Sequence, residues 1–143
     1  MKLTRILIGE ILESNPGFEK EIDKLKDKGA TYIDSGDYGS VYLLNGKAVK
    51  VTTDEVELEH AQALEGKKTN NFVYIYDVQV INPKLGIITM DVMGKFKGEV
   101  PEEFIYNLEK EAKSLGIDPE ELDIRPDNFM VHPKSGNIKM TDV

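Results

Sequence analysis

Two short segments in the first third of the chain carry residue types suited to binding phosphate. Gly36-Asp37-Tyr38-Gly39 lies between two strand-like runs, and glycines at such a turn let the backbone approach a ligand and direct N–H groups at phosphate oxygens. Lys50 follows on the return strand between Val49 and Val51, where an ammonium group can neutralise inner phosphates. Each feature also has a plain structural interpretation, since a Gly-x-x-Gly is often only a turn and a strand lysine often extends into water.

Oxygen ligands and proton-accepting groups gather near the end of the chain. Asp123 and Asn128 flank Arg125-Pro126, and Asp142 follows a predicted hairpin. Carboxylate and amide oxygens are ligands that Mg²⁺ accepts, and a carboxylate can also orient or accept the proton of an attacking hydroxyl. Asp and Asn beside proline also build ordinary Asx turns. The joint spacing of Asp123 and Asn128 makes this turn interpretation the weaker one.

Taken in order, these segments resemble the signature set of the protein kinase superfamily. That set is a glycine-rich loop, a strand lysine, a catalytic-loop Asp with an Asn five residues on, and a metal-binding Asp after a short hairpin. The resemblance covers Thr31 to Val143. It implies an ATP site in which Gly36 and Gly39 supply the loop over the phosphates and Lys50 supplies the cation.

The same resemblance assigns roles to the second segment. Asp123 would orient the attacking hydroxyl or accept its proton, and Arg125 would sit near the transferring phosphate. Asn128 and Asp142 would hold Mg²⁺. ATP and Mg²⁺ are therefore the expected cofactors.

The run Leu85 to Met93 resembles the strand that leads into the kinase hinge. The resemblance implies that an adenine would hydrogen-bond the backbone at about Asp91 to Met93, with Met90 as the gatekeeper. Val41, at the end of the glycine-rich run, is counted with the cofactor-binding residues. Met90 is also read as a buried strand methionine that fills the core, and both interpretations can hold at once.

A helix acid is expected to pair with Lys50. Glu57 is our choice, because apolar residues follow it at the steps that the family shows, and Glu59 is the alternative. On a helix this acidic, either residue can belong simply to a solvated face. Lys50 and Glu57 are only seven residues apart in the sequence, closer than is usual in the family.

The chain departs from the family pattern at three places. Val143 stands where the family has Phe, the catalytic loop reads Glu121-Leu122-Asp123 where the family has His-Arg-Asp, and the sequence stops at residue 143. We therefore expect a minimal form that ends at the metal-binding Asp and lacks the activation segment and most of the second lobe. This layout is similar to that of the small effector kinases that some bacteria inject into their hosts.

Composition excludes several other classes. The 143 residues are 40% apolar and 31% charged, with a net charge of −8, no Cys and two His. This balance suits one folded domain and disfavours binding to nucleic acid or acidic membrane surfaces. Without Cys there are no disulfides or thiolate zinc sites. The N-terminal apolar run is too short for a signal peptide or membrane span, so we expect a soluble, cytoplasmic protein.

The pattern of apolar residues predicts an α+β fold with an antiparallel sheet. We expect one kinase-like domain, with N-terminal helices over residues 1–30, an N-lobe over 31–93 and a reduced C-lobe over 94–143. His60 and His132 are given surface or capping positions and no catalytic role. The predicted elements are helices at 4–13, from 18 to 29, from a Thr52 or Thr53 cap to 64, at 101–116 and at 118–122, and strands at 31–33, 41–44, 47–51, 72–81, 85–93, 129–131 and 138–140.

Three functions agree with these features. The first is a minimal Ser/Thr kinase that binds ATP with Mg²⁺ and phosphorylates itself or a bound partner. The second is a pseudokinase that binds nucleotide or a protein partner without catalysis, and the third is a fragment of a larger kinase. A protein partner or self-association is expected, because Ile124, Phe129 and Met130 would be uncovered unless the N-terminal helix through Ile8 and Ile11 covers them.

Overall fold

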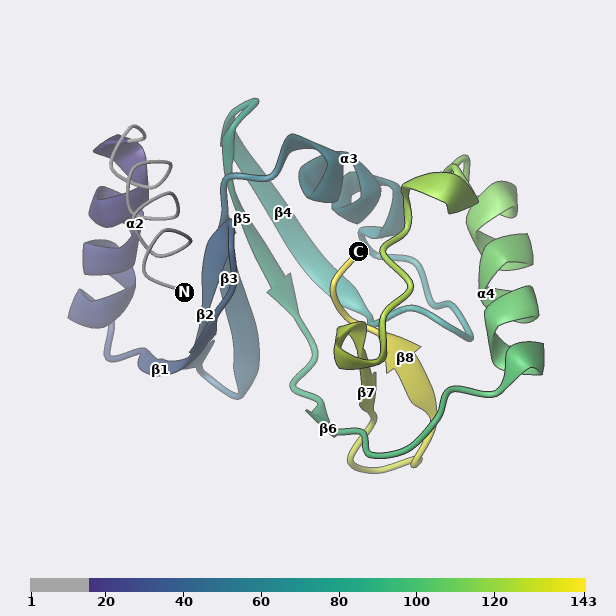
Figure 1. Cartoon of the computed structure of the whole chain (residues 1–143). Coiled ribbons are helices and arrows are strands. Elements are labelled where there is room, and N and C mark those ends of the chain that lie inside the picture. Colours follow the sequence, from purple (N-terminus) through teal and green to yellow (C-terminus); the bar gives the residue numbers. More distant parts are fainter. Residues whose placement is uncertain (1–15) are drawn as a thin grey trace, which may run out of the picture.

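The computed structural model describes residues 16–143, so the helix predicted over residues 4–13 lies outside the described residues. A five-stranded antiparallel sheet and a three-stranded sheet form its framework (Figure 1). The larger sheet has the order β1-β2-β3-β5-β4 and the smaller has the order β6-β7-β8. The strands are β1 Thr31–Ser35, β2 Gly39–Leu44, β3 Lys47–Thr52, β4 Ile75–Asn82, β5 Leu85–Met90, β6 Gly94–Lys95, β7 Phe129–Val131 and β8 Ile138–Met140.

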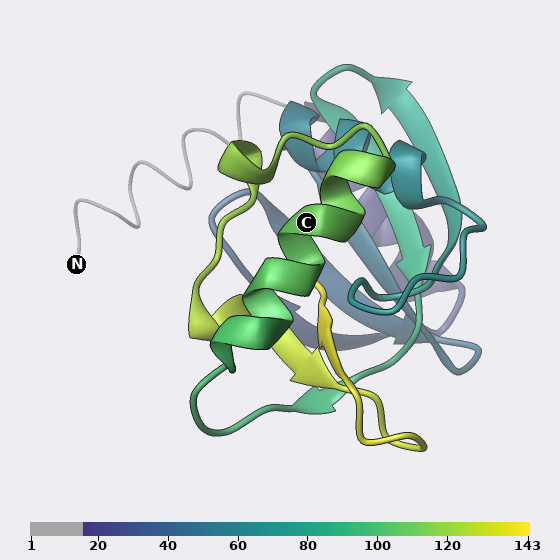
Figure 2. The same ribbon diagram turned by 90° about the vertical axis from the view of Figure 1, so that its right-hand side faces the viewer.

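Helices cover both faces of the larger sheet. α2 (Pro16–Asp27) packs on one face and α3 (Glu55–Leu64) on the other, while α4 (Glu102–Ser114) lies against the smaller sheet. Figure 2 looks onto α4, with both sheets behind it. The α+β class and antiparallel sheet expected from the sequence are confirmed.

α2 buries an apolar stripe with helical spacing. Phe18, Ile22 and Leu25 are each 3–5% exposed. They form a second core with sheet residues that face away from the cleft described below, namely Tyr42, Val49, Val51 and Leu85. This helix therefore supports the strand that carries Lys50 from its far side.

The β2–β3 hairpin turns at Asn45-Gly46 as predicted. Both residues have positive φ, 52° and 75°, which the tight two-residue turn requires. Leu44 pairs with Lys47 across this turn, and the register then sets Val41 opposite Lys50. The turn thus fixes which side chains of the two strands share the cleft face.

The predicted Thr52 or Thr53 cap of α3 is wrong. Asp54 is the N-cap, and its carboxylate accepts hydrogen bonds from the backbone N–H groups of Val56 and Glu57 at 3.0 and 3.3 Å. Thr52 still belongs to β3, and its hydroxyl accepts from the Asp54 N–H at 3.1 Å. The helix can begin only after the strand ends, which moves the cap along the chain.

Two strand boundaries differ from the prediction by three residues, and the others by at most two. β4 begins at Ile75 rather than Phe72, and β5 ends at Met90 rather than Met93. Phe72 is 1% exposed and forms a bridge with Met140 of β8. Apolar residues near 72 are thus buried between the two sheets rather than within the larger one. β6, which the sequence did not indicate, follows directly and pairs with β7.

The short 3-10 turn Pro119–Glu121, capped by Asp118, and the β7–β8 hairpin agree with the sequence prediction. Phe129, expected to be uncovered unless the N-terminal helix covers it, is 2% exposed, and its ring packs edge-on against Phe104 of α4 with 5.7 Å between the ring centroids. Ile124 is exposed and Met130 is half-buried. Within residues 16–143, none of the helices has the length and apolar character to cross a membrane.

Candidate active site

A cleft of about 610 Å³ lies between the larger sheet and the loops that precede β7 and follow β8. Its volume falls within the range of small-molecule sites, about 300–1,000 Å³. All twelve residues singled out from the sequence line this cleft: Gly36, Gly39, Val41, Lys50, Glu57, Met90, Asp91, Met93, Asp123, Arg125, Asn128 and Asp142. Segments far apart in the chain therefore meet at one place.

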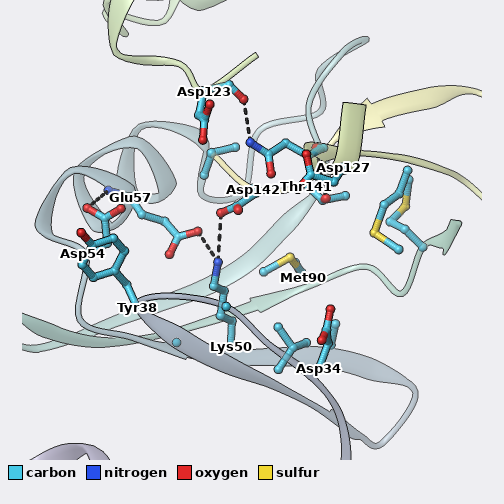
Figure 3. A pocket seen from close by; sticks show the side chains of 18 of the residues that line it. Asp34, Tyr38, Lys50, Asp54, Glu57, Met90, Asp123, Asp127, Thr141 and Asp142 are labelled. Carbon is cyan, nitrogen blue, oxygen red and sulfur yellow. Dashed lines mark hydrogen bonds and ion pairs between the residues drawn. The ribbon is translucent and has the colours of Figure 1, made fainter. Parts of the chain in front are cut away.

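Lys50 lies at the centre of the cleft, between two carboxylates. Its Nζ is 2.6 Å from Glu57 Oε2 and 3.0 Å from Asp142 Oδ1 (Figure 3). Lys50 stands on β3, the middle strand of the sheet, and Glu57 on the first turn of α3. The structure thus pairs Lys50 with Glu57 despite their short separation, whereas Glu59 is exposed.

Burial and charge act in opposite directions on these groups. Burial would lower the pKa of Lys50, but the carboxylates of Glu57 and Asp142 outweigh it and raise this pKa above its ordinary value. Burial raises the pKa of Glu57 to about 7, against the opposing effect of Lys50. Partial burial would raise the pKa of Asp142, but Lys50, together with Glu57 and Arg125, more than offsets it and this pKa is lowered.

Backbone hydrogen bonds hold the segment that carries Asp142. The Met140 N–H donates to the Asn71 carbonyl at 2.8 Å, and the Val73 N–H donates to the Met140 carbonyl at 3.0 Å. The Thr141 N–H donates to the Asn128 carbonyl at 2.9 Å. Asp142 is therefore fixed next to the loop that carries Asn128.

The loop before β7 brings Asp123, Arg125 and Asn128 together. Arg125 Nη2 is 2.7 Å from Asp123 Oδ2, and both side chains are more than half exposed. Asn128 is 3% exposed, and its amide N–H donates to the Asp123 carbonyl at 2.6 Å. This bond uses one of the two amide hydrogens and fixes the orientation of the Asn128 amide, whose oxygen can accept from or ligate another partner.

The residue types near Asp142 fit a Mg²⁺ ion. Mg²⁺ usually takes one or two carboxylates together with phosphate oxygens and water. Asn128 offers an amide oxygen, and Asp142 offers the carboxylate oxygen that does not contact Lys50. Among residues 16–143 there is no group of three His, Asp or Glu side chains placed to hold a metal ion without further ligands.

The glycine-rich turn joins β1 to β2. A Cβ at Gly39 would stand 2.4 Å from the Val51 carbonyl oxygen, so only glycine fits there. A Cβ at Gly36 would meet nothing within 4 Å. The Gly36 N–H donates to the Gly39 carbonyl at 2.9 Å, which closes the turn. Gly39 therefore serves the packing of β2 on β3, and Gly36 lies open to the cleft.

The linker after β5 presents backbone groups to the cleft. Met90 is 6% exposed and pairs with Ala48 and Ile75 across the sheet, so it lines the cleft and also fills the core. The Asp91 N–H donates to the Tyr74 carbonyl at 3.1 Å. Its carboxylate accepts from the Tyr76 hydroxyl at 2.5 Å. Asp91 and Met93 both line the cleft.

The cleft is strongly acidic. Lys50 and Arg125 are the cations among its lining residues in the described part of the chain, against nine carboxylates. These nine are Asp34, Asp37, Asp54, Glu57, Asp91, Glu121, Asp123, Asp127 and Asp142. A polyphosphate entering this cleft needs compensating cations.

The two histidines differ from each other. His132 caps its turn as predicted, since its Nδ1 accepts from the Lys134 N–H at 3.2 Å. The surface or capping position predicted for His60 is wrong, because this side chain is buried at 5% exposure. Its Nδ1 is 2.6 Å from the Val143 carbonyl oxygen, and its Nε2 is 3.8 Å from Glu121. The sequence signal that could have predicted this burial is the position of His60 one turn after Glu57 on the same helix.

Comparison with known proteins identifies the fold. No protein-family model and no curated protein matches the sequence. Solved structures do match: Rad53 in complex with AMP-PNP aligns with a TM-score of 0.56 and 18% identity over 82% of this chain. The PknI kinase domain of Mycobacterium tuberculosis, in a mutant form, aligns with a TM-score of 0.54 and 13% identity over 78%.

The chain has a protein kinase-like fold, the fold that the order of its motifs predicted. It spans 38% of the length of the Rad53 chain and 57% of the length of the PknI chain. At these identities the likeness concerns the fold alone. The activity must therefore be argued from the site.

Proposed function

We propose that this protein binds ATP with Mg²⁺ and transfers the γ-phosphoryl group to a Ser or Thr hydroxyl, on itself or on a bound protein. The observation that carries the proposal is Lys50, held 2.6 Å from Glu57 and 3.0 Å from Asp142 in a cleft of nucleotide size. Such an arrangement places one ammonium where inner phosphates would lie, with a carboxylate beside it for the metal.

The adenine would occupy the end of the cleft beside Met90. There the Asp91 carbonyl can accept a hydrogen bond from the adenine amino group, and the Met93 N–H can donate to a ring nitrogen. Val41 and Ala48 line the cleft on the two neighbouring strands. Their apolar side chains supply flat surfaces for a ring.

The phosphates would lie between the glycine-rich turn and Lys50. When bound, Mg²⁺ would neutralise the charge that develops on the β- and γ-phosphates. Asn128 and Asp142 are the residues that would hold it. The positive charge of Mg²⁺ would also offset the excess of carboxylates around the cleft.

Asp123 would serve the attacking hydroxyl. In the transfer, the hydroxyl oxygen bonds to the γ-phosphorus, the bond from that phosphorus to the β-γ bridging oxygen breaks, and ADP leaves. The hydroxyl proton passes to the Asp123 carboxylate. Arg125, now paired with Asp123 at 2.7 Å, would turn toward the transferring phosphate to stabilise its charge.

A pseudokinase is the second candidate function. The observation that favours it is the Asp123–Arg125 ion pair, which engages both groups proposed for catalysis. In this alternative the cleft binds nucleotide or a protein partner without transfer. Ile124, exposed beside Asp123, would belong to the surface that such a partner contacts.

Transfer of label from γ-³²P-ATP with Mg²⁺ tests the proposal and separates the two candidates. The purified chain is incubated alone and with a protein extract, beside Asp123→Asn. We expect labelled protein with the wild type and loss of label with the variant. Equal background label in both, together with intact nucleotide binding, would support the pseudokinase instead.

A further inference from the structure

His60 joins α3 to both loops that carry the proposed catalytic and metal-binding carboxylates. The residue lies one turn after Glu57, with its ring buried at 5% exposure. Nδ1 is 2.6 Å from the Val143 carbonyl oxygen and Nε2 is 3.8 Å from Glu121 Oε2. Val143 directly follows Asp142, and Glu121 lies two residues before Asp123.

We propose that His60 is a positioning residue of the active site, which holds Asp142 in register with Lys50. This inference rests on the proposed function, because the register matters for a metal–nucleotide complex. The proposed role involves no direct contact between His60 and the ligand, because His60 does not line the cleft.

The hydrogen-bonding capacity of the imidazole supports this role. The main-chain oxygen of Val143, the last residue of the given sequence, only accepts, so Nδ1 must carry the hydrogen that is donated to it. Nε2 then faces another acceptor, the Glu121 carboxylate, which is 46% exposed. The bond to Val143 persists in the neutral and in the charged ring, whereas the attraction to Glu121 requires the charged ring.

The bond to Val143 completes the attachment of the Asp142 segment. The ladder of β7 and β8 ends with the pair Phe129 and Met140, and the Thr141 N–H bonds to the Asn128 carbonyl. Among residues 16–143, the hydrogen bond from His60 to Val143 is the one that holds the backbone beyond Thr141. Asp142 itself is half exposed, and its side chain contacts Lys50.

Two connections therefore run from one helical turn to two adjacent residues. Glu57 reaches Asp142 through Lys50 by side chains, and His60 reaches Val143 by a backbone contact. A bound metal–nucleotide complex would compete for Lys50 and for Asp142. The His60 bond would then keep Asp142 in place while its side chain changes partners.

The chain offers a matched pair of variants. His60→Asn places an amide N–H near the position of Nδ1 and keeps a donor for Val143. His60→Gln carries the same amide one methylene farther out, near Nε2, and loses that donor. Gln62→Ala, on the exposed face of α3, is the control for the helix. Ile22→Ala, in the core on the opposite face of the sheet, is the control for stability lost without removing a contact on the cleft side.

The first measurement is titration calorimetry of the full chain with AMP-PNP and Mg²⁺. We expect His60→Gln to weaken binding by roughly tenfold, the low end for a lost supporting contact at a metal site. His60→Asn, Gln62→Ala and Ile22→Ala should stay within about threefold of the wild type. Equal affinities for the Asn and Gln variants would overturn the proposal.

The second measurement is independent of nucleotide. Backbone ¹⁵N relaxation of the free protein reports the order of Asp142 and Val143. We expect order to fall in His60→Gln and to be retained in His60→Asn, and unchanged order in both would overturn the positioning role. A wild type that shows ordered residues but no nucleotide binding would refute the proposed function and leave the positioning role supported.

Discussion

Lys50 and Asp142 lie 92 residues apart in the sequence, yet the Lys50 ammonium is 3.0 Å from the Asp142 carboxylate. The contact joins the central strand of the larger sheet to the segment after β8 (Figure 3). It places a cation next to the carboxylate that we propose as a ligand of Mg²⁺.

Lys50→Met should weaken the binding of Mg·ATP by about tenfold or more, because a charge-assisted contact of about 1.5–3 kcal/mol is lost. Thermal unfolding with millimolar Mg·ATP measures this, since a ligand that binds only the folded state raises Tm. Lys47→Met is the matched control, because Lys47 lies on the same strand with its ammonium over the Tyr76 ring. An equal rise of Tm in wild type and Lys50→Met would contradict the assignment.

Asp142→Asn and Asp123→Asn should separate binding from chemistry. We expect both to abolish phosphoryl transfer, but only Asp142→Asn to weaken Mg²⁺-dependent nucleotide binding, because Asp123 acts on the hydroxyl. Calorimetric titration beside the transfer assay distinguishes them, with exposed Asp77→Asn as the control. Weakened binding in Asp123→Asn to the same degree would refute the division of roles.

Glu57→Gln should change how stability depends on pH. The pKa of Glu57 is raised to about 7, so the folded state binds a proton more tightly than the unfolded state. Its contribution to stability is full below the ordinary pKa and is lost as pH rises toward 7. The free energy of unfolding in urea should therefore fall from pH 5 to pH 7.5 more steeply in the wild type than in Glu57→Gln, by on the order of 2 kcal/mol.

The lowered pKa of Asp142 affects stability in a different pH range. Its contribution is present above the ordinary pKa near 3.8 and is lost as pH falls below that value. It therefore leaves the comparison between pH 5 and pH 7.5 unaffected. If the free energy of unfolding depends on pH in the same way in the wild type and in Glu57→Gln, burial does not raise the pKa of Glu57, which contradicts the prediction.

The two loop glycines should respond differently to alanine. Gly39→Ala places a Cβ 2.4 Å from the Val51 carbonyl oxygen, and we expect a loss of about 1–3 kcal/mol in unfolding free energy. Gly36→Ala meets open space and should change stability by less than about 0.5 kcal/mol. Chemical denaturation of the two variants checks this, and similar losses in both would contradict the packing argument.

The sequence predicted the elements with strong local signals. Asn45-Gly46 specified its hairpin, and the apolar stripe of Phe18, Ile22 and Leu25 specified α2, because turn chemistry and helical spacing are local properties. The motif order also predicted the fold and the residues of the cleft. The boundaries at Thr52 and Met93 were wrong because strand pairing with distant residues decides where a strand ends.

His60 shows what sequence reasoning could not reach. Its partners are the carbonyl of Val143, 83 residues away, and the carboxylate of Glu121. A backbone carbonyl leaves no trace in residue type, so nothing in the sequence marks this partner. Glu57 was preferred over Glu59 on family spacing, and its contact with Lys50 became definite only with the structure.

Titration of the wild-type chain with AMP-PNP, in Mg²⁺ and again in EDTA, tests most directly that the acidic cleft is a metal–nucleotide site. Nine carboxylates against two cations make free nucleotide an unfavourable ligand, so we predict saturable binding in Mg²⁺ and at least tenfold weaker binding in EDTA. No binding heat in Mg²⁺, or equal affinity in EDTA, would contradict the account.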